Sequence, residues 1–181
     1  MTQDIRLVKL AENVGCIAGE NVKDEVMKGS DAITSKTSQG KKAKWVKGAM
    51  ERLNSLVDQE TGNEIMGNCS CETEGKIKKA KSLYSNSIDI DDFLSKLSKA
   101  RIVGTRLARE GDIIYVFYDR CYCGLVKATK EKIPVTYCQC SRGYTQKVFE
   151  GIFERSLRVD LLQSIINGDK ECKFAVYLEG D

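Results

Sequence analysis

Apolar residues recur every three or four positions through much of the first hundred residues, which is the spacing of one face of an α-helix. Asp89 precedes the last of these runs and stands where a helix N-cap belongs. Between the first two runs, the segment 29–40 is rich in Ser, Thr and Gly, which predicts a loop. The predicted helices cover residues 7–17, 46–57, 64–66, 77–84 and 90–97.

From residue 103 the pattern changes to the alternation and the β-branched and aromatic content that are typical of strands. Residues 113–118 (IIYVFY) are apolar or aromatic on both faces, which predicts a central strand. A helix capped by Ser141 is expected at 141–153. Strands are expected at 103–109, 112–119, 157–165 and 172–178, with turns at Glu110-Gly111 and Asn167-Gly168-Asp169.

This order of elements predicts an α+β fold. N-terminal helices would pack on an antiparallel sheet of about four strands, with a hairpin, a helix and a hairpin in the C-terminal half. Residues 1–62 would form a helical region that packs on or extends a Cys-rich α+β domain of residues 63–181. We expect the two parts to form one folded unit, because 181 residues suit a single domain.

Composition restricts the chemistry more than the fold. The chain has no histidine, which excludes Ser-His-Asp and Cys-His catalysis, His-ligated zinc hydrolases and zinc nucleobase deaminases. No apolar run is long enough to cross a bilayer, and the N-terminus lacks the apolar stretch of a signal peptide. We therefore expect a cytoplasmic protein without a membrane partner.

Basic residues gather between Lys36 and Lys47, although the net charge of the chain is only +3. A solvated helix surface is the simpler interpretation of this stretch, and the edge of a dimer contact is an alternative. Only Trp45 adds an aromatic side chain to it. Nucleic acid is therefore not expected as a partner of the protein.

Six of the eight cysteines form three Cys-x-Cys pairs, each at the end of a predicted element. If the end of the central strand adjoins the start of the last helix, four thiols come within reach of one another. A metal site of Cys121, Cys123, Cys138 and Cys140 is therefore predicted, to which Cys69 and Cys71 are less secure additions.

Four thiolates suit zinc, although zinc ligands usually have two to four residues between them and these pairs have one. Iron or copper would accept the same soft ligands. Redox thiols are the alternative, with metal binding ahead of them. Cys140 precedes a predicted helix and adjoins Arg142, and both features favour a thiolate. Buried thiols without chemistry would also fit, and Cys172 and Cys16 are expected to be core or incidental thiols.

The C-terminal stretch carries motifs that resemble known families. Cys121-Tyr122-Cys123-Gly124 and Cys138-Gln139-Cys140-Ser141 look like those of an uncharacterised prokaryotic Cys-rich family, over about residues 64–178. Gly168-Asp169, followed by Cys172-Lys173-Phe174, resembles the ends of 4-vinyl reductase domains and of L-2-amino-thiazoline-4-carboxylate hydrolase-like proteins. The resemblance implies an α+β domain, often a homodimer, with a pocket for a small apolar or aromatic molecule.

Two functions follow from these patterns. The first is a small-molecule-binding domain with a cysteine-thiolate site, its ligand lying between sheet and helices. The second is a thiol-dependent hydrolase or redox enzyme, in which Cys140 or Cys123 would be the low-pKa cysteine. Candidate ligand-binding residues are Tyr115, Phe117, Tyr122, Arg142 and Tyr144, and ordinary core packing is the alternative for the aromatic ones.

Overall fold

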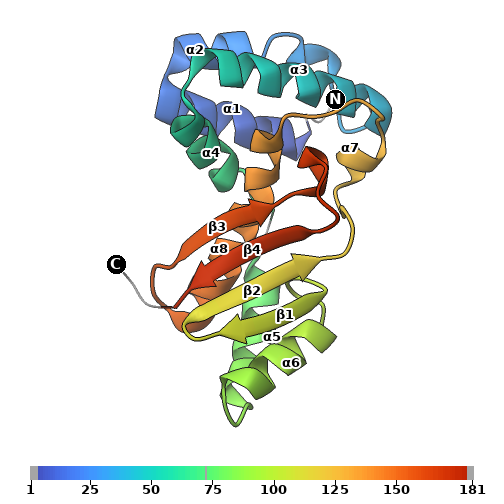
Figure 1. The fold of residues 1–181 in the computed structure, drawn as a ribbon. Coiled ribbons are helices and arrows are strands. Elements are labelled where there is room, and N and C mark those ends of the chain that lie inside the picture. Colours follow the sequence, from blue (N-terminus) through green and yellow to red (C-terminus); the bar gives the residue numbers. More distant parts are fainter. Residues whose placement is uncertain (1–3, 72, 179–181) are drawn as a thin grey trace. The chain divides into compact units, whose positions relative to one another are not determined.

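A computed structural model describes residues 4–71 and 73–178 (Figure 1). The chain forms two compact units, and it passes from one to the other three times. Unit 1 comprises Met1–Cys69 and Cys121–Cys140, and unit 2 comprises Ser70–Arg120 and Ser141–Asp181. Each unit has its own buried interior and is described by itself.

Unit 1 is built from helices whose apolar stripes meet in a buried core. The periodicity that predicted the first two long helices is confirmed, since Leu10 and Val14 in α1 and Val46 and Leu53 in α3 are all buried. The helices of unit 1 are α1 (Ile5–Ala18), α2 (Glu20–Val26), α3 (Gln39–Leu56), α4 (Gln59–Asn68) and α7 (Gly124–Lys127). Of these, the short α2 was not predicted from the sequence.

The returning segment 121–140 packs on the N-terminal helices of unit 1. Leu125 and Ile133 are almost fully buried. Thr136 donates a hydrogen bond through Oγ1 to Asn54 Oδ1 in α3, at 2.9 Å. These contacts make a segment that is distant in sequence an integral part of the helical unit.

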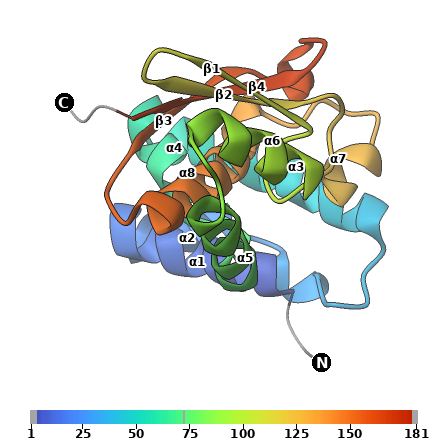
Figure 2. The ribbon, with the colours of Figure 1, turned by 90° about the horizontal axis from the view of Figure 1, so that it is seen from below.

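Unit 2 contains the antiparallel sheet, and the predicted α+β class is confirmed. The strands lie in the order β1-β2-β4-β3, so the IIYVFY strand is central, as predicted. The helices of unit 2 lie behind the sheet in Figure 1 and below it in Figure 2. The elements are α5 (Glu74–Ser85), α6 (Ile90–Lys99), β1 (Arg106–Glu110), β2 (Ile113–Tyr118), α8 (Gln139–Phe153), β3 (Arg158–Gln163) and β4 (Cys172–Tyr177).

The space between the sheet and the helices of unit 2 is filled by hydrophobic core. Ile114 and Val116 of β2 belong to the same buried cluster as Phe93 of α6 and Phe149 of α8. A ligand pocket between these layers stays a prediction, and it would have to lie among these large apolar side chains. Among the described residues, no helix is long and apolar enough to span a bilayer.

Two helix starts test the capping predictions. Asp89 is the N-cap of α6 and accepts a hydrogen bond from the Asp92 backbone N–H at 2.8 Å, as predicted. The predicted start of the last helix at Ser141 is wrong, because α8 begins at Gln139, directly after a 3-10 turn at Val135–Cys138. Cys140 therefore lies within the first turn of α8 and not before it.

Two glycines of unit 2 with positive φ provide a matched test of the packing. Gly104 has φ +68° and Gly111 has φ +57°, but a Cβ on Gly104 would lie 2.9 Å from Val116 Cγ1, whereas one on Gly111 meets nothing within 4 Å. We expect Gly111→Ala to lower the free energy of unfolding by about 1 kcal/mol through backbone strain. Gly104→Ala should lower it by about 3 kcal/mol, because a clash is added to the strain. Urea unfolding followed by circular dichroism measures both, and equal losses would contradict the packing around Gly104.

Candidate functional site

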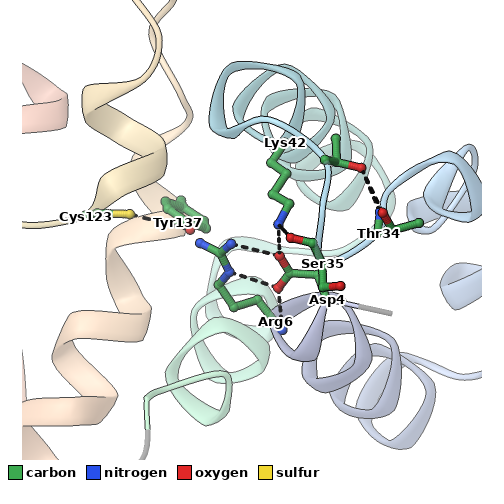
Figure 3. A network of polar contacts seen from close by, with 8 residues as sticks. Asp4, Arg6, Thr34, Ser35, Lys42, Cys123 and Tyr137 are labelled. Atoms are coloured by element: carbon green, nitrogen blue, oxygen red, sulfur yellow. Dashed lines mark hydrogen bonds and ion pairs between the residues drawn. The ribbon is translucent and has the colours of Figure 1, made fainter. Parts of the chain in front are cut away.

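A buried carboxylate organises the polar interior of unit 1 (Figure 3). Asp4 is the N-cap of α1 and is 5% exposed. It accepts hydrogen bonds from the Arg6 backbone N–H at 3.0 Å, from Arg6 Nε at 3.0 Å and from Arg6 Nη2 at 2.8 Å. Lys42 Nζ lies 2.8 Å from Asp4 Oδ2, the oxygen that also accepts the hydrogen bond from Arg6 Nη2. One acidic side chain therefore pairs with two cations.

Lys42 corrects the interpretation of the basic stretch as a wholly solvated surface. It is 3% exposed, and its Nζ also donates a hydrogen bond to the Ser35 backbone carbonyl at 3.0 Å. The sequence carried a signal for this, since Lys42 lies four residues before Val46 and so falls on the apolar stripe of α3. A lysine on that stripe needs a buried partner, and Asp4 supplies it.

The pairing fixes the charge states of the cluster. Hydrogen bonding from Arg6 is the main cause that holds the pKa of Asp4 well below its usual range, and Lys42 acts in the same direction against the opposing effect of burial. Asp4 in turn raises the pKa of Arg6. Two cations against one carboxylate leave a net positive charge, and the Arg6 side chain is the more exposed cation at 40%.

The phenol of Tyr137 lies beside that guanidinium in Figure 3, and the thiol of Cys123 lies on the other side of the phenol. Cys123 Sγ is 3.7 Å from Tyr137 OH, and Tyr137 is only 9% exposed. Burial is the largest cause that raises the pKa of Tyr137 well above its ordinary value, followed by the nearby sulfurs of Cys123 and Cys140. The phenol therefore keeps its proton at neutral pH and remains a hydrogen-bond donor. We call Arg6, Cys123 and Tyr137 the thiol–phenol cluster.

Five of the six predicted cysteine ligands lie in unit 1, and one lies in unit 2. Cys121, Cys123, Cys138 and Cys140 lie in unit 1 with Cys69, whereas Cys71 is an exposed residue of unit 2. Cys69 ends α4, and its Sγ lies 3.7 Å from the Lys9 carbonyl oxygen and 3.8 Å from Asn13 Nδ2.

A metal centre is not supported by this arrangement. Within residues 4–71 and 73–178, no group of three or more His, Cys, Asp or Glu side chains is placed to hold a metal ion. The described part of the chain therefore gives no support for the expected zinc site of Cys121, Cys123, Cys138 and Cys140. Cys123 and Cys140 both lie near Tyr137.

The other candidate residues lie in different surroundings. Tyr115 and Phe117 alternate with the core residues of β2 and so lie on the sheet face opposite the helices. Tyr122 is an exposed residue of unit 1. Arg142 donates to Gln146 Oε1 at 3.0 Å, and Tyr144 OH donates to the Ile102 carbonyl at 2.7 Å.

The remaining thiols are not fully buried. Cys172 is half-buried at the edge of the unit 2 core, and Cys16 is exposed. A polar cleft of about 630 Å³ in unit 2 is lined by none of these candidates. Its lining residues are Asp119, Gln163, Gly168, Asp169, Lys170 and Glu171.

The buried carboxylate gives a pH-dependent prediction. A folded-state pKa below the unfolded value of about 3.9 means that Asp4 stabilises the fold above that pH and that this stabilisation is lost as the pH falls below it. At pH 7 we expect Asp4→Asn to lower the free energy of unfolding by about 3 kcal/mol, because Lys42 remains buried without its counter-charge. The difference in the free energy of unfolding between wild type and Asp4→Asn should become smaller as the pH falls from about 5 toward 2.

Trp45, the one tryptophan of the chain, lies in α3 and reports unfolding of unit 1 by its fluorescence. The exposed Asp31→Asn is the control and should change stability by less than about 0.5 kcal/mol. If the free energies of unfolding of Asp4→Asn and wild type differ by the same amount from pH 7 to pH 2, the lowered pKa of Asp4 is contradicted.

Comparison with known proteins adds a family but no activity. No curated protein matches the chain. A similar solved structure is the NMR structure of the H-NOX domain from Shewanella oneidensis in the Fe(II)CO ligation state, with 14% identity over 99% of this chain and 100% of that one, and a TM-score of 0.48. Similarity of this extent establishes neither a shared fold nor a shared ligand. The sequence model of the family of unknown function DUF6144 matches residues 1–180, and the chain belongs to that family.

Proposed function

We propose that the protein binds a small anionic molecule at the thiol–phenol cluster of unit 1, with Cys123 as the reactive group of the site. The observation that carries the proposal is the contact of 3.7 Å between Cys123 Sγ and Tyr137 OH, beside a guanidinium that Asp4 holds in place. The resemblance to 4-vinyl reductase and L-2-amino-thiazoline-4-carboxylate hydrolase-like domains supports a small molecule as the ligand, and the anionic group is inferred from the charges of this site alone.

The preference for an anion follows from charge. Asp4 is shared between Lys42 and Arg6, so its single negative charge does not balance both cations. Lys42 is enclosed, whereas the Arg6 side chain is 40% exposed. A carboxylate or another small anion would complete the pairing of Arg6, whose fork of donors suits a planar acid.

The thiol and the phenol add directional chemistry. Tyr137 retains its proton and donates a hydrogen bond to an acceptor on the ligand or to the sulfur of Cys123. Cys123 is half-buried, so its sulfur retains access from outside unit 1. These groups select a ligand in which an anionic group stands near a soft or electrophilic atom.

A thiol-dependent enzyme at the same place is the second candidate. It is favoured by the same arrangement, because a sulfur nucleophile next to a cation and a hydroxyl donor has groups that stabilise negative charge during reaction. In that case Cys123, which contacts Tyr137, would be the nucleophile in preference to Cys140.

Two alkylating reagents of equal chemistry and different charge test the anion preference. Iodoacetate is anionic and iodoacetamide is neutral, so the ratio of their rates at one cysteine reports the local charge. We expect this ratio to be about fivefold higher at Cys123 than at the exposed Cys16, because the one net positive charge of Asp4, Arg6 and Lys42 is worth about 1 kcal/mol nearby. Peptide mass spectrometry after short exposures measures both sites in one sample.

The variant Arg6→Gln supplies the matched control. It leaves the buried pair of Asp4 and Lys42 in place, so Trp45 fluorescence should still show a folded unit 1. In this variant the ratio at Cys123 should fall to that of Cys16, and the ratio at Cys16 should not change. Equal ratios at the two cysteines in wild type, or no effect of Arg6→Gln, would sink the proposal.

A further inference from the structure

The sheet of unit 2 has a second face that its helices do not cover (Figures 1 and 2). Side chains that alternate with the core residues of the strands lie on it. Tyr115 pairs with Ala108 of β1 and with Ala175 of β4, so no bulky side chain flanks its ring across the strands. We call this the aromatic–basic face, and its members are Arg106, Ala108, Tyr115, Phe117, Arg158, Asp160, Lys173, Ala175 and Tyr177.

Each aromatic ring of this face has a cation over it. The Arg106 guanidinium lies 3.5 Å from the centroid of Phe117, and Arg158 lies 4.6 Å from that of Tyr177. Lys173 Nζ lies 4.1 Å from the centroid of Tyr115 and 5.4 Å from that of Phe117. Rings and cations therefore alternate across neighbouring strands.

The charges on this face are only partly balanced. Arg158 pairs with Asp160 at 2.7 Å, and Arg106 pairs with Glu171 at 3.4 Å. Over the described part of the chain, Lys173 in the middle of the face forms no ion pair with a carboxylate. An anionic group near the centre of the face therefore finds a cation that no acid neutralises.

The rings are arranged as a platform. Tyr115 and Phe117 have centroids 6.4 Å apart, and Tyr177 pairs with Ile113, two residues from Tyr115 on the same face. Tyr115 and Tyr177 are half-buried, whereas Phe117 is 8% exposed beneath Arg106. Phe117 therefore supports the platform, and the two tyrosines are its accessible rings.

We propose that the aromatic–basic face binds single-stranded nucleic acid. Its unpaired bases would replace Lys173 over the Tyr115 ring and Arg158 over the Tyr177 ring, and these two cations would turn to its phosphates together with Arg106. An acidic peptide would use the cations and leave the rings without a role, and an apolar peptide would use the rings and desolvate the cations. A strand of nucleic acid presents flat rings and negative charges in alternation, as this face requires.

Fluorescence anisotropy with labelled 12-nucleotide uridine RNA and thymidine DNA tests the proposal on the full chain at low salt. Tyr115→Leu and Tyr177→Leu should each weaken binding about tenfold, because each removes one stacking surface. Tyr84→Leu is the control, since Tyr84 is a 42%-exposed ring of α5 in the helical layer. Three phosphate contacts predict a slope of about −2 for the logarithm of the affinity against the logarithm of the salt concentration.

Lys173→Gln should weaken binding several-fold, whereas Lys170→Gln, at an exposed position nearby, should not. Ultraviolet cross-linking of the wild type followed by mass spectrometry should label the peptides that contain Tyr115 or Tyr177, and this readout does not depend on folding of the variants. The proposal is overturned by absence of binding to either oligonucleotide, by equal affinity for one nucleotide and for twelve, or by cross-links confined to the lysines of α3. It is also overturned if the tyrosine variants abolish a dimer of this chain and leave nucleic-acid binding unchanged.

Discussion

The carboxylate of Asp4, shared between the buried Lys42 and the guanidinium of Arg6, is the interaction on which unit 1 depends. An ammonium group enclosed in a helical core is tolerated only with a counter-charge and further acceptors, and Lys42 finds both in Asp4 and the Ser35 carbonyl. This pairing ties the start of α1 to the start of α3 and to the loop between α2 and α3. The cation that remains more exposed, Arg6, is held where it faces Cys123 and Tyr137.

Local patterns predicted the elements of unit 2 well. The apolar content of residues 113–118 on both faces identified a central strand, and Asp89 marked the first turn of α6. The same strand also shows the limit of the pattern. Ile114 and Val116 face the core, but Tyr115 and Phe117 face away from it and are covered partly by cations. The sequence pattern shows that a strand is apolar on both faces, but it does not show whether helices or cationic side chains cover the second face.

The candidate site was harder to predict from the sequence, because it depends on contacts between segments that are distant along the chain. Residues 121–140 return to the N-terminal helices, and nothing in their local periodicity indicates this. Side chains one residue apart in Cys-x-Cys pairs need not converge, since a strand end, a 3-10 turn and a helix start direct them differently. Asp4 and Lys42 each carried a local signal, as an N-cap and as a lysine on an apolar stripe, but only the structure pairs them.

A double-mutant cycle on Asp4 and Lys42 tests this central pairing most directly. The free energies of unfolding of wild type, Asp4→Asn, Lys42→Met and the double variant would be measured in urea by the fluorescence of Trp45. A coupling energy of about 2 kcal/mol is expected, because each single change leaves a buried partner unmatched and the double change does not. Additive losses, with a coupling within about 0.3 kcal/mol of zero, would show that the two side chains do not meet in the folded protein.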